Sequence, residues 1–148
     1  MISANELRIG NYVNHKSEGI SRVTEIESHK NHIGVTPLSF NNYVFMCPEI
    51  KPIPLTPEIL EKCGFEKRFI KNDICYCLPY LRPSGKKQMH DIVLVNFGTF
   101  DNNLKNVYAF AIKEYDRNIQ FAVTYIKNVH QLQNLYFALT GEELIYKP

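Results

Sequence analysis

The segment from Asn128 to Gly141 constrains the fold more than any other part of this 148-residue chain, because it signals where a helix begins, which face is buried and where it ends. Asn128 is a good N-cap, and Gln131 stands three residues later, where its side chain can reach back to the cap. Apolar residues recur at steps of three and four and form one stripe: Val129, Leu132, Leu135, Tyr136 and Leu139. Gly141 is a left-handed stop. The pattern predicts an amphipathic helix with His130, Gln133 and Asn134 off the stripe.

A helix of this length is marginal in water, so its apolar stripe needs a cover. The preceding segment 119–126 alternates as a strand does. Its packed face would hold Ile119, Phe121, Val123 and Tyr125, and its other face Gln120, Ala122 and Thr124. We therefore expect the terminal helix to pack across a sheet that ends with this strand, with its stripe hidden beneath the last hairpin.

The composition describes a globular protein with an ordinary core, because 45% of the residues are apolar. The formal charge of +2 is too near neutral to argue for nucleic acid or an anionic membrane as the partner of the whole chain. Residues 1–6 lack a basic start before an apolar core, and no apolar run reaches the length of a membrane span. We expect a cytoplasmic protein that does not enter a membrane.

Short strands separated by polar turns fill the first 55 residues. Their expected positions are 7–13, 20–26, 33–35 and 43–45. Proline flanks the stretch 50–53, which limits it to an edge strand or an extended connector. The number of strands in so short a segment predicts a small β-barrel-like module at 1–55.

The remainder, 56–148, begins with a short helix and returns to strands. Thr56 is the expected N-cap, Pro57 fits the first turn, and Gly64 ends the helix. Strands are expected at 65–70, 74–82, 89–97, 107–113 and 119–126, paired as an antiparallel sheet. The fold class is thus α+β, and the sequence leaves open whether the two modules have separate cores or share one.

Two resemblances add to this interpretation. Ile9-Gly10-Asn11-Tyr12-Val13, followed by the alternating segment 22–26, resembles the opening of SH3-like barrels. The terminal helix motif 129–144, with the segments 52–60 and 7–13, resembles a family of small uncharacterised proteins encoded by phages and prophages of gut anaerobic bacteria. That family carries no assigned activity, ligand or catalytic residue, so the resemblance implies a phage or prophage accessory protein and no particular chemistry.

Cysteines and histidines are the candidates for metal or catalytic chemistry. Cys75 and Cys77 share one face of a strand, and with Cys47 or Cys63 they offer thiolate ligands for zinc. No paired Cys-x-x-Cys or Cys/His spacing supports a zinc site, so we interpret all four as reduced thiols, mostly buried as small apolar side chains.

The histidines and the known motifs offer no catalytic site either. His29 and His32 fall in an expected turn, where a solvated loop is the simpler interpretation. His130 lies in the first turn of the terminal helix, where a positive ring opposes the helix dipole, so it should be neutral or face solvent. No nucleophile elbow, phosphate loop or zinc-protease helix occurs. We expect no enzymatic activity, no cofactor and no metal.

The segment 62–87 is the most basic part of the chain, and aromatic residues interleave with its cations. Six of these cations are candidate nucleic-acid contacts: Lys67, Arg68, Lys71, Arg82, Lys86 and Lys87. The simpler interpretation makes them a solvated hairpin around core aromatics. The leading expectation is therefore a protein that binds another protein through a sheet edge or an aromatic surface, and the alternative is a nucleic-acid-binding module.

Overall fold

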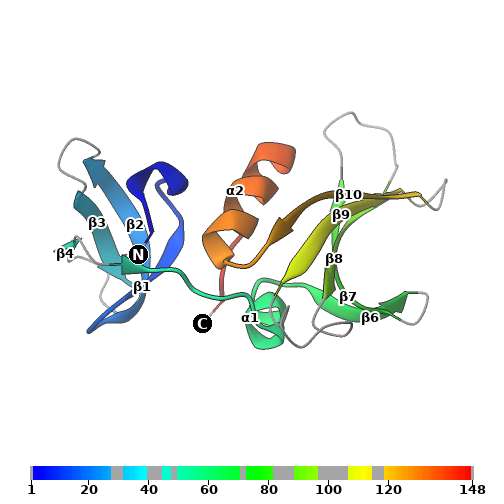
Figure 1. The fold of residues 1–148 in the computed structure, drawn as a ribbon, viewed down its shortest axis with the longest axis horizontal. Helices are drawn as coiled ribbons and strands as arrows, with labels where there is room; N and C mark the ends of the chain where they lie inside the picture. The colour runs from blue at the N-terminus through cyan, green and yellow to red at the C-terminus, as the bar shows by residue number, and fades with distance from the viewer. Residues whose placement is uncertain are drawn as a thin grey trace. The chain divides into compact units, whose positions relative to one another are not determined.

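The computed structural model describes residues 2–27, 32–39, 45–47, 50–70, 73–81, 89–96, 107–114 and 119–147. It is an α+β protein with two five-stranded antiparallel sheets and a C-terminal helix, as the sequence predicted at that level (Figure 1). The chain forms two compact units. Unit 1 holds residues 1–54 and 128–143, and unit 2 holds residues 55–127 and 144–148.

The sheet of unit 1 is an antiparallel meander that a fifth strand completes. Its strands are β1 (Tyr12–His15), β2 (Gly19–Glu27), β3 (His32–Pro37), β4 (Phe45–Cys47) and β5 (Ile50–Lys51). They lie in the order β4-β3-β2-β1-β5, so the last strand pairs with the first. Among the described residues no pairing joins β4 to β5, so the expected barrel is present only as an open sheet.

Residues 7–11 do not continue β1, contrary to the expected strand at 7–13. A 3-10 helix, η1 (Ala4–Glu6), begins at Ser3, whose backbone N–H donates to the Glu6 carboxylate at 3.2 Å. A turn follows, in which the Asn11 N–H donates to the Arg8 carbonyl at 3.1 Å and Gly10 has φ +97°. Because Gly10 takes this left-handed conformation, the extended chain starts only at Tyr12.

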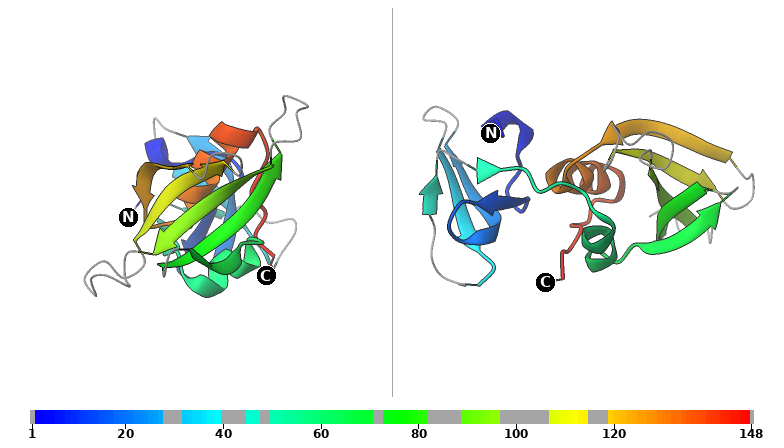
Figure 2. Two further views of the ribbon diagram at one scale, coloured as in Figure 1. Left: turned by 90° about the vertical axis from the view of Figure 1, so that its right-hand side faces the viewer. Right: turned by 60° about the horizontal axis from the view of Figure 1, so that its bottom comes forward.

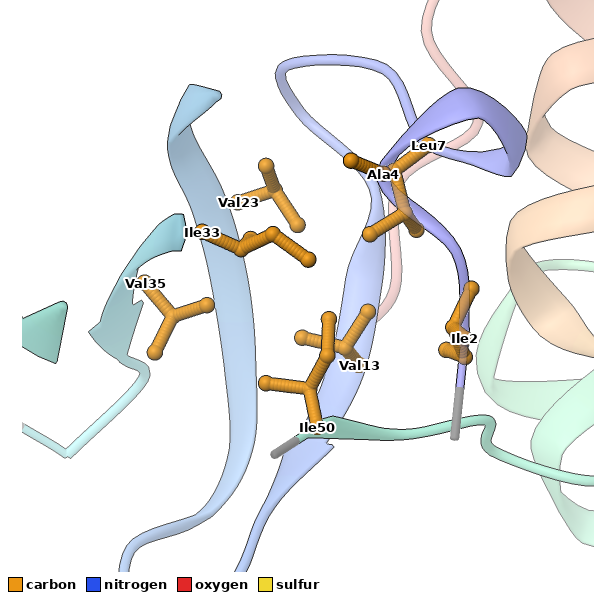
Figure 3. Packing of buried hydrophobic residues seen from close by; sticks show 8 residues of the cluster. All are labelled: Ile2, Ala4, Leu7, Val13, Val23, Ile33, Val35 and Ile50. Atoms are coloured by element: carbon orange, nitrogen blue, oxygen red, sulfur yellow. The ribbon is translucent and has the colours of Figure 1, made fainter. Parts of the chain in front are cut away.

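The core of unit 1 forms where the sheet meets the N-terminal segment. Figure 3 shows these side chains converging from β1, β2, β3, β5 and the segment around η1. The cluster consists of Ile2, Ala4, Leu7, Val13, Val23, Ile33, Val35 and Ile50. The alternating sequences of β2 and β3 predicted one buried face on each strand, and Val23, Ile33 and Val35 are almost fully buried.

Helix α2 (Val129–Thr140) also belongs to unit 1, whereas the sequence placed it with the second sheet. Its ends are as predicted: the Gln131 side chain accepts from the Asn128 N–H at 3.2 Å, and Gly141 is left-handed at φ +74°. Of the apolar stripe, Val129, Leu132 and Tyr136 are buried, and Leu135 and Leu139 are half-buried.

Polar residues off that stripe explain why α2 belongs to unit 1. Gln133 is 1% exposed, and its side-chain carbonyl accepts from the Tyr12 N–H at 2.7 Å while its amide donates to the Gly10 carbonyl at 3.3 Å. A residue of a parallel neighbouring strand would pair with the same two groups. Asn134 adds two bonds, accepting from the Asn11 side chain at 2.9 Å and donating to the Glu6 carbonyl at 3.0 Å.

The end of α2 is held by an arginine. Arg8 makes two contacts with the Glu143 carboxylate, at 2.6 and 3.0 Å, and its guanidinium carbon lies 4.0 Å from the centre of the Phe137 ring. Both charged side chains remain about a third exposed, so the geometry matters more than the charge. A planar guanidinium suits both a carboxylate and an aromatic face.

Unit 2 is an insertion between β5 and α2. Its sheet has the order β10-β9-β8-β7-β6, every neighbouring pair antiparallel, as the sequence predicted (Figure 2). The strands are β6 (Glu66–Ile70), β7 (Asp73–Leu81), β8 (Met89–Asn96), β9 (Tyr108–Glu114) and β10 (Ile119–Ile126). Helix α1 (Pro57–Lys62) precedes them, and the Thr56 hydroxyl accepts from the Ile59 N–H at 3.3 Å, as its predicted capping role requires.

The two chain segments that enter and leave the insertion lie side by side. Pro54 and Asn128 form an isolated antiparallel bridge. On one side of it the Val129 N–H donates to the Ile53 carbonyl at 2.9 Å, and on the other the Leu55 N–H donates to the Lys127 carbonyl at 2.8 Å. The expected boundary at residue 55 is therefore close to the first crossing, but the return of the chain to unit 1 at Asn128 was not expected.

Replacing Gln133 by Leu should destabilise unit 1 strongly, because the substitution leaves the Tyr12 N–H and the Gly10 carbonyl without their partner. We expect a loss of about 1 to 3 kcal/mol for each orphaned group, measured as the free energy of unfolding in urea. Gln131→Leu on the same helix is the matched control, since the bond that it removes is a capping bond to the Asn128 N–H, worth about 0.5 to 1 kcal/mol. Equal losses in the two variants would contradict this role of Gln133.

Candidate functional site

The predicted basic segment is only partly described. Lys67 and Arg68 lie on β6, whereas Lys71, Arg82, Lys86 and Lys87 lie outside the described residues. Lys67 is exposed, and its amine lies 6.0 Å from the centre of the Phe69 ring, which is 74% exposed. Of the candidate contacts that are described, Lys67 is the exposed cation, and it lies beside one exposed aromatic ring.

Arg68 forms ion pairs with two acidic residues. Its guanidinium contacts the Glu66 carboxylate at 2.8 Å and the Asp91 carboxylate at 3.2 Å. The Asp91 side chain is only 2% exposed, so this ion pair is partly buried. Two carboxylates beside one guanidinium reduce the attraction that Arg68 exerts on a phosphate, which weakens the predicted role of this residue.

The two edges of the unit 2 sheet differ in their chemistry. Among the described strands, β6 and β10 each have one neighbour and stand at opposite margins of the sheet (Figure 2). Three of the five residues of β6 are charged. The eight residues of β10, Ile-Gln-Phe-Ala-Val-Thr-Tyr-Ile, include no charge, no proline and no glycine. Edge strands of natural proteins are usually protected by charge or proline, and β10 has neither.

One irregularity interrupts β10. Its register with β9 shifts between Ala122 and Thr124, which marks a β-bulge. Phe121 is therefore opposite Ile112 while Tyr125 is opposite Ala109, so positions 121 and 125 lie on opposite faces. The prediction that Ile119, Phe121, Val123 and Tyr125 share one packed face is wrong at Tyr125, which is 64% exposed, whereas Ile126 is 3% exposed.

The cysteines whose side chains are described are buried. Burial raises the pKa of the Cys63 thiol to about 12, so this sulfur stays protonated and unreactive at neutral pH. Cys75 and Cys77 pack with Val93 and Ala111 in one apolar cluster, and the side chain of Cys47 lies outside the description. In the described ranges no three His, Cys, Asp or Glu side chains gather closely enough for a shared metal ion.

Tyr108 and His130 are buried side chains whose polar atoms have no hydrogen-bond partner among the described residues. The Tyr108 hydroxyl is fully buried beside the Tyr76 ring, with no hydrogen-bond partner among the described atoms. Burial, followed by the nearby Tyr76, raises the pKa of Tyr108, so its hydroxyl stays neutral. The alternation of its strand predicts burial for this position, but no local pattern reports that a hydroxyl lacks a partner.

His130 is the second of these groups. It is 1% exposed, and neither ring nitrogen has a hydrogen-bond partner in the part of the chain that the structure describes. Burial lowers the pKa of His130, and the carboxylate of Glu6 opposes this shift. The ring is therefore neutral, as predicted, but it does not face solvent. Of the other histidines, His15 accepts from the Glu18 N–H at 3.3 Å in a turn, and His29 lies outside the description.

No protein-family description, curated protein or solved structure matches this chain. None of the helices described is both long and apolar enough to cross a membrane. Among the described residues, the uncharged edge strand β10 is the surface whose chemistry best fits a binding site.

Acid should destabilise unit 1 through His130. The folded-state pKa is below the ordinary value of 6.5, so the unfolded chain binds the proton more tightly. The free energy of unfolding of the wild type, relative to His130→Gln, should be constant above pH 6.5 and fall below it by at most about 1.4 kcal/mol per pH unit, the slope for one proton.

Urea unfolding at a series of pH values measures this difference. Glu6→Gln should extend the pH range of the loss, because the carboxylate of Glu6 favours the charged ring. If the free energies of unfolding of the wild type and His130→Gln fall in parallel as the pH is lowered, the His130 ring does not cause the loss of stability.

Proposed function

We propose that this chain is a non-enzymatic binding protein that accepts an extended segment of another protein at the open edge of β10. The observation that carries the proposal is the absence of every charged residue, proline and glycine from this eight-residue edge strand. A partner strand would pair with backbone N–H and C=O groups on the side of β10 away from β9, where no other described strand pairs with it.

The opposite edge supports the choice of β10. Charged side chains interrupt β6, and its Arg68 already contacts two carboxylates, so a strand added there must accommodate charges at successive positions. On β10 itself, Thr124 and Tyr125 are exposed, and Tyr125 has an aromatic ring with a polar tip. Such rings are common at protein interfaces.

The wider interpretation of the chain is part of the same proposal. The motif in the terminal helix supports a phage or prophage accessory protein, and the reduced, buried Cys63 supports a cytoplasmic one. The pairing of β5 with β1 supports an SH3-like barrel for unit 1, since joining the last strand to the first is a step toward closing a barrel. Nothing in this function needs a cofactor.

A second candidate function is nucleic-acid binding at β6. The exposed Phe69 ring with the Lys67 amine beside it favours this alternative, since a base can stack on the ring while the amine meets a phosphate. The neighbouring Glu66 carboxylate counts against it.

A fluorescent peptide with the sequence of residues 119–126 and solubilising ends tests strand addition at β10. We expect it to bind the wild-type protein, measured by fluorescence anisotropy, and to lose affinity at least about tenfold for Thr124→Lys, since a charge beside the edge opposes pairing with an apolar strand. A peptide with proline at alternate positions should not bind, because it lacks backbone N–H groups.

Phe69→Lys is the matched control for this experiment, because it also adds a lysine at an exposed position of an edge strand. It should leave the affinity unchanged. Equal binding of the proline peptide, or equal losses in the two lysine variants, would rule out pairing at β10.

A single-stranded oligonucleotide tests the second candidate. Binding through Lys67 and Phe69 should fall steeply with added salt and weaken in Phe69→Ala, where one stacked base is worth about 1 to 3 kcal/mol. Absence of binding at low salt would remove nucleic acid as a partner of this site.

A further inference from the structure

The residues of β10 restrict the kind of strand that fits beside it. A charged side chain directly opposite an apolar one loses hydration without gaining a partner, so a matching strand should be uncharged across the paired positions. It should also carry apolar or small polar residues with strong β-propensity. A strand of this kind is already present in the chain, and it is β10.

We propose that the segment that occupies the β10 edge is β10 of a second copy of this chain. This inference rests on the proposed function and names its partner. Two β10 strands that run antiparallel about a two-fold axis would join the two sheets of unit 2 into one continuous sheet of ten strands, from two sheets of five.

Charge complementarity favours this pairing over the other ways of joining two edges. A β10–β10 pair brings no two charges together, because β10 has none. A β6–β6 pair places Glu66, Lys67 and Arg68 of one copy within cross-strand reach of the same residues of the other, so like charges meet in several registers.

The symmetry of the contact also favours a β10–β10 pair. A β10–β10 contact uses the same surface on both copies and closes after two chains. A β6–β10 contact would instead use two different surfaces and could continue without end. Charges on β6 oppose that open arrangement, and their absence from β10 permits the closed one.

The bulge in β10 fits the same assignment. The register of β10 with β9 is regular over 119–122 and shifts between Ala122 and Thr124. Because a bulge locally disrupts the ladder, it shortens the regular edge with which a second copy can pair. Thr124 and Tyr125, both exposed, lie just beyond that stretch, so a lysine at either position adds a charge at the end of the paired edge.

Sedimentation velocity of the full chain over a wide dilution series tests the proposal. The wild type should approach twice the 17.2 kDa chain mass at high concentration and dissociate on dilution. Thr124→Lys and Tyr125→Lys should sediment as monomers throughout, whereas Phe69→Lys, which alters the other edge, should associate like the wild type.

Two further measurements keep the test independent of folding defects. Circular dichroism shows whether each variant keeps its strands, and hydrogen exchange of the wild type should show slower exchange of β10 amides at high concentration. A wild type that stays monomeric at all concentrations would overturn the pairing of two β10 strands. So would a dimer that dissociates in Phe69→Lys but persists in Thr124→Lys.

The two proposals fail in distinguishable ways. A monomeric protein that still binds the 119–126 peptide, with the expected sensitivity to Thr124→Lys, retains strand addition as its function and excludes a second copy as the partner. A monomer that binds no peptide removes both proposals.

Discussion

The carboxamide of Gln133 is the contact on which the organisation of unit 1 depends. It joins the helix to the chain just before β1 by pairing with one backbone donor and one backbone acceptor. The same segment pairs with β2 on its other side, where the Gly10 N–H donates to the Val23 carbonyl and the Asn11 carbonyl accepts from the Val23 N–H, each at 2.8 Å. Gln133 serves the two groups that point toward the helix. A side chain thus takes the place of a strand and brings the last helix of the chain to its first strand.

This contact explains the discontinuous course of the chain. Because α2 returns to the N-terminal sheet, the 55–127 segment becomes an insertion whose two ends meet at Pro54 and Asn128. Among the described strands of the inserted sheet, β6 and β10 each have one neighbour. Charged residues protect the edge of β6, whereas β10 has no charge and carries a bulge.

Much of the local structure followed from sequence patterns because its causes are local. The caps at Thr56 and Asn128, the left-handed Gly141 and the hairpin pairing of β6 with β7 each depend on residues a few positions apart. The candidate nucleic-acid contacts were predicted less accurately. Lys67 is exposed as expected, but the partners of Arg68 come from its own strand and from β8, and the register that brings Asp91 close is not visible in a charge count.

The sequence by itself determined the α+β class, the antiparallel pairing and the burial of Val129, Leu132 and Tyr136, because periodicity and capping are properties of neighbouring residues. Only the tertiary structure decided that Gln133 is buried, that Tyr125 turns to the opposite face, and that uncharged β10 stands at a sheet margin. The physical reason is the same in each case: these outcomes depend on which distant backbone groups pair, and that choice belongs to the whole chain.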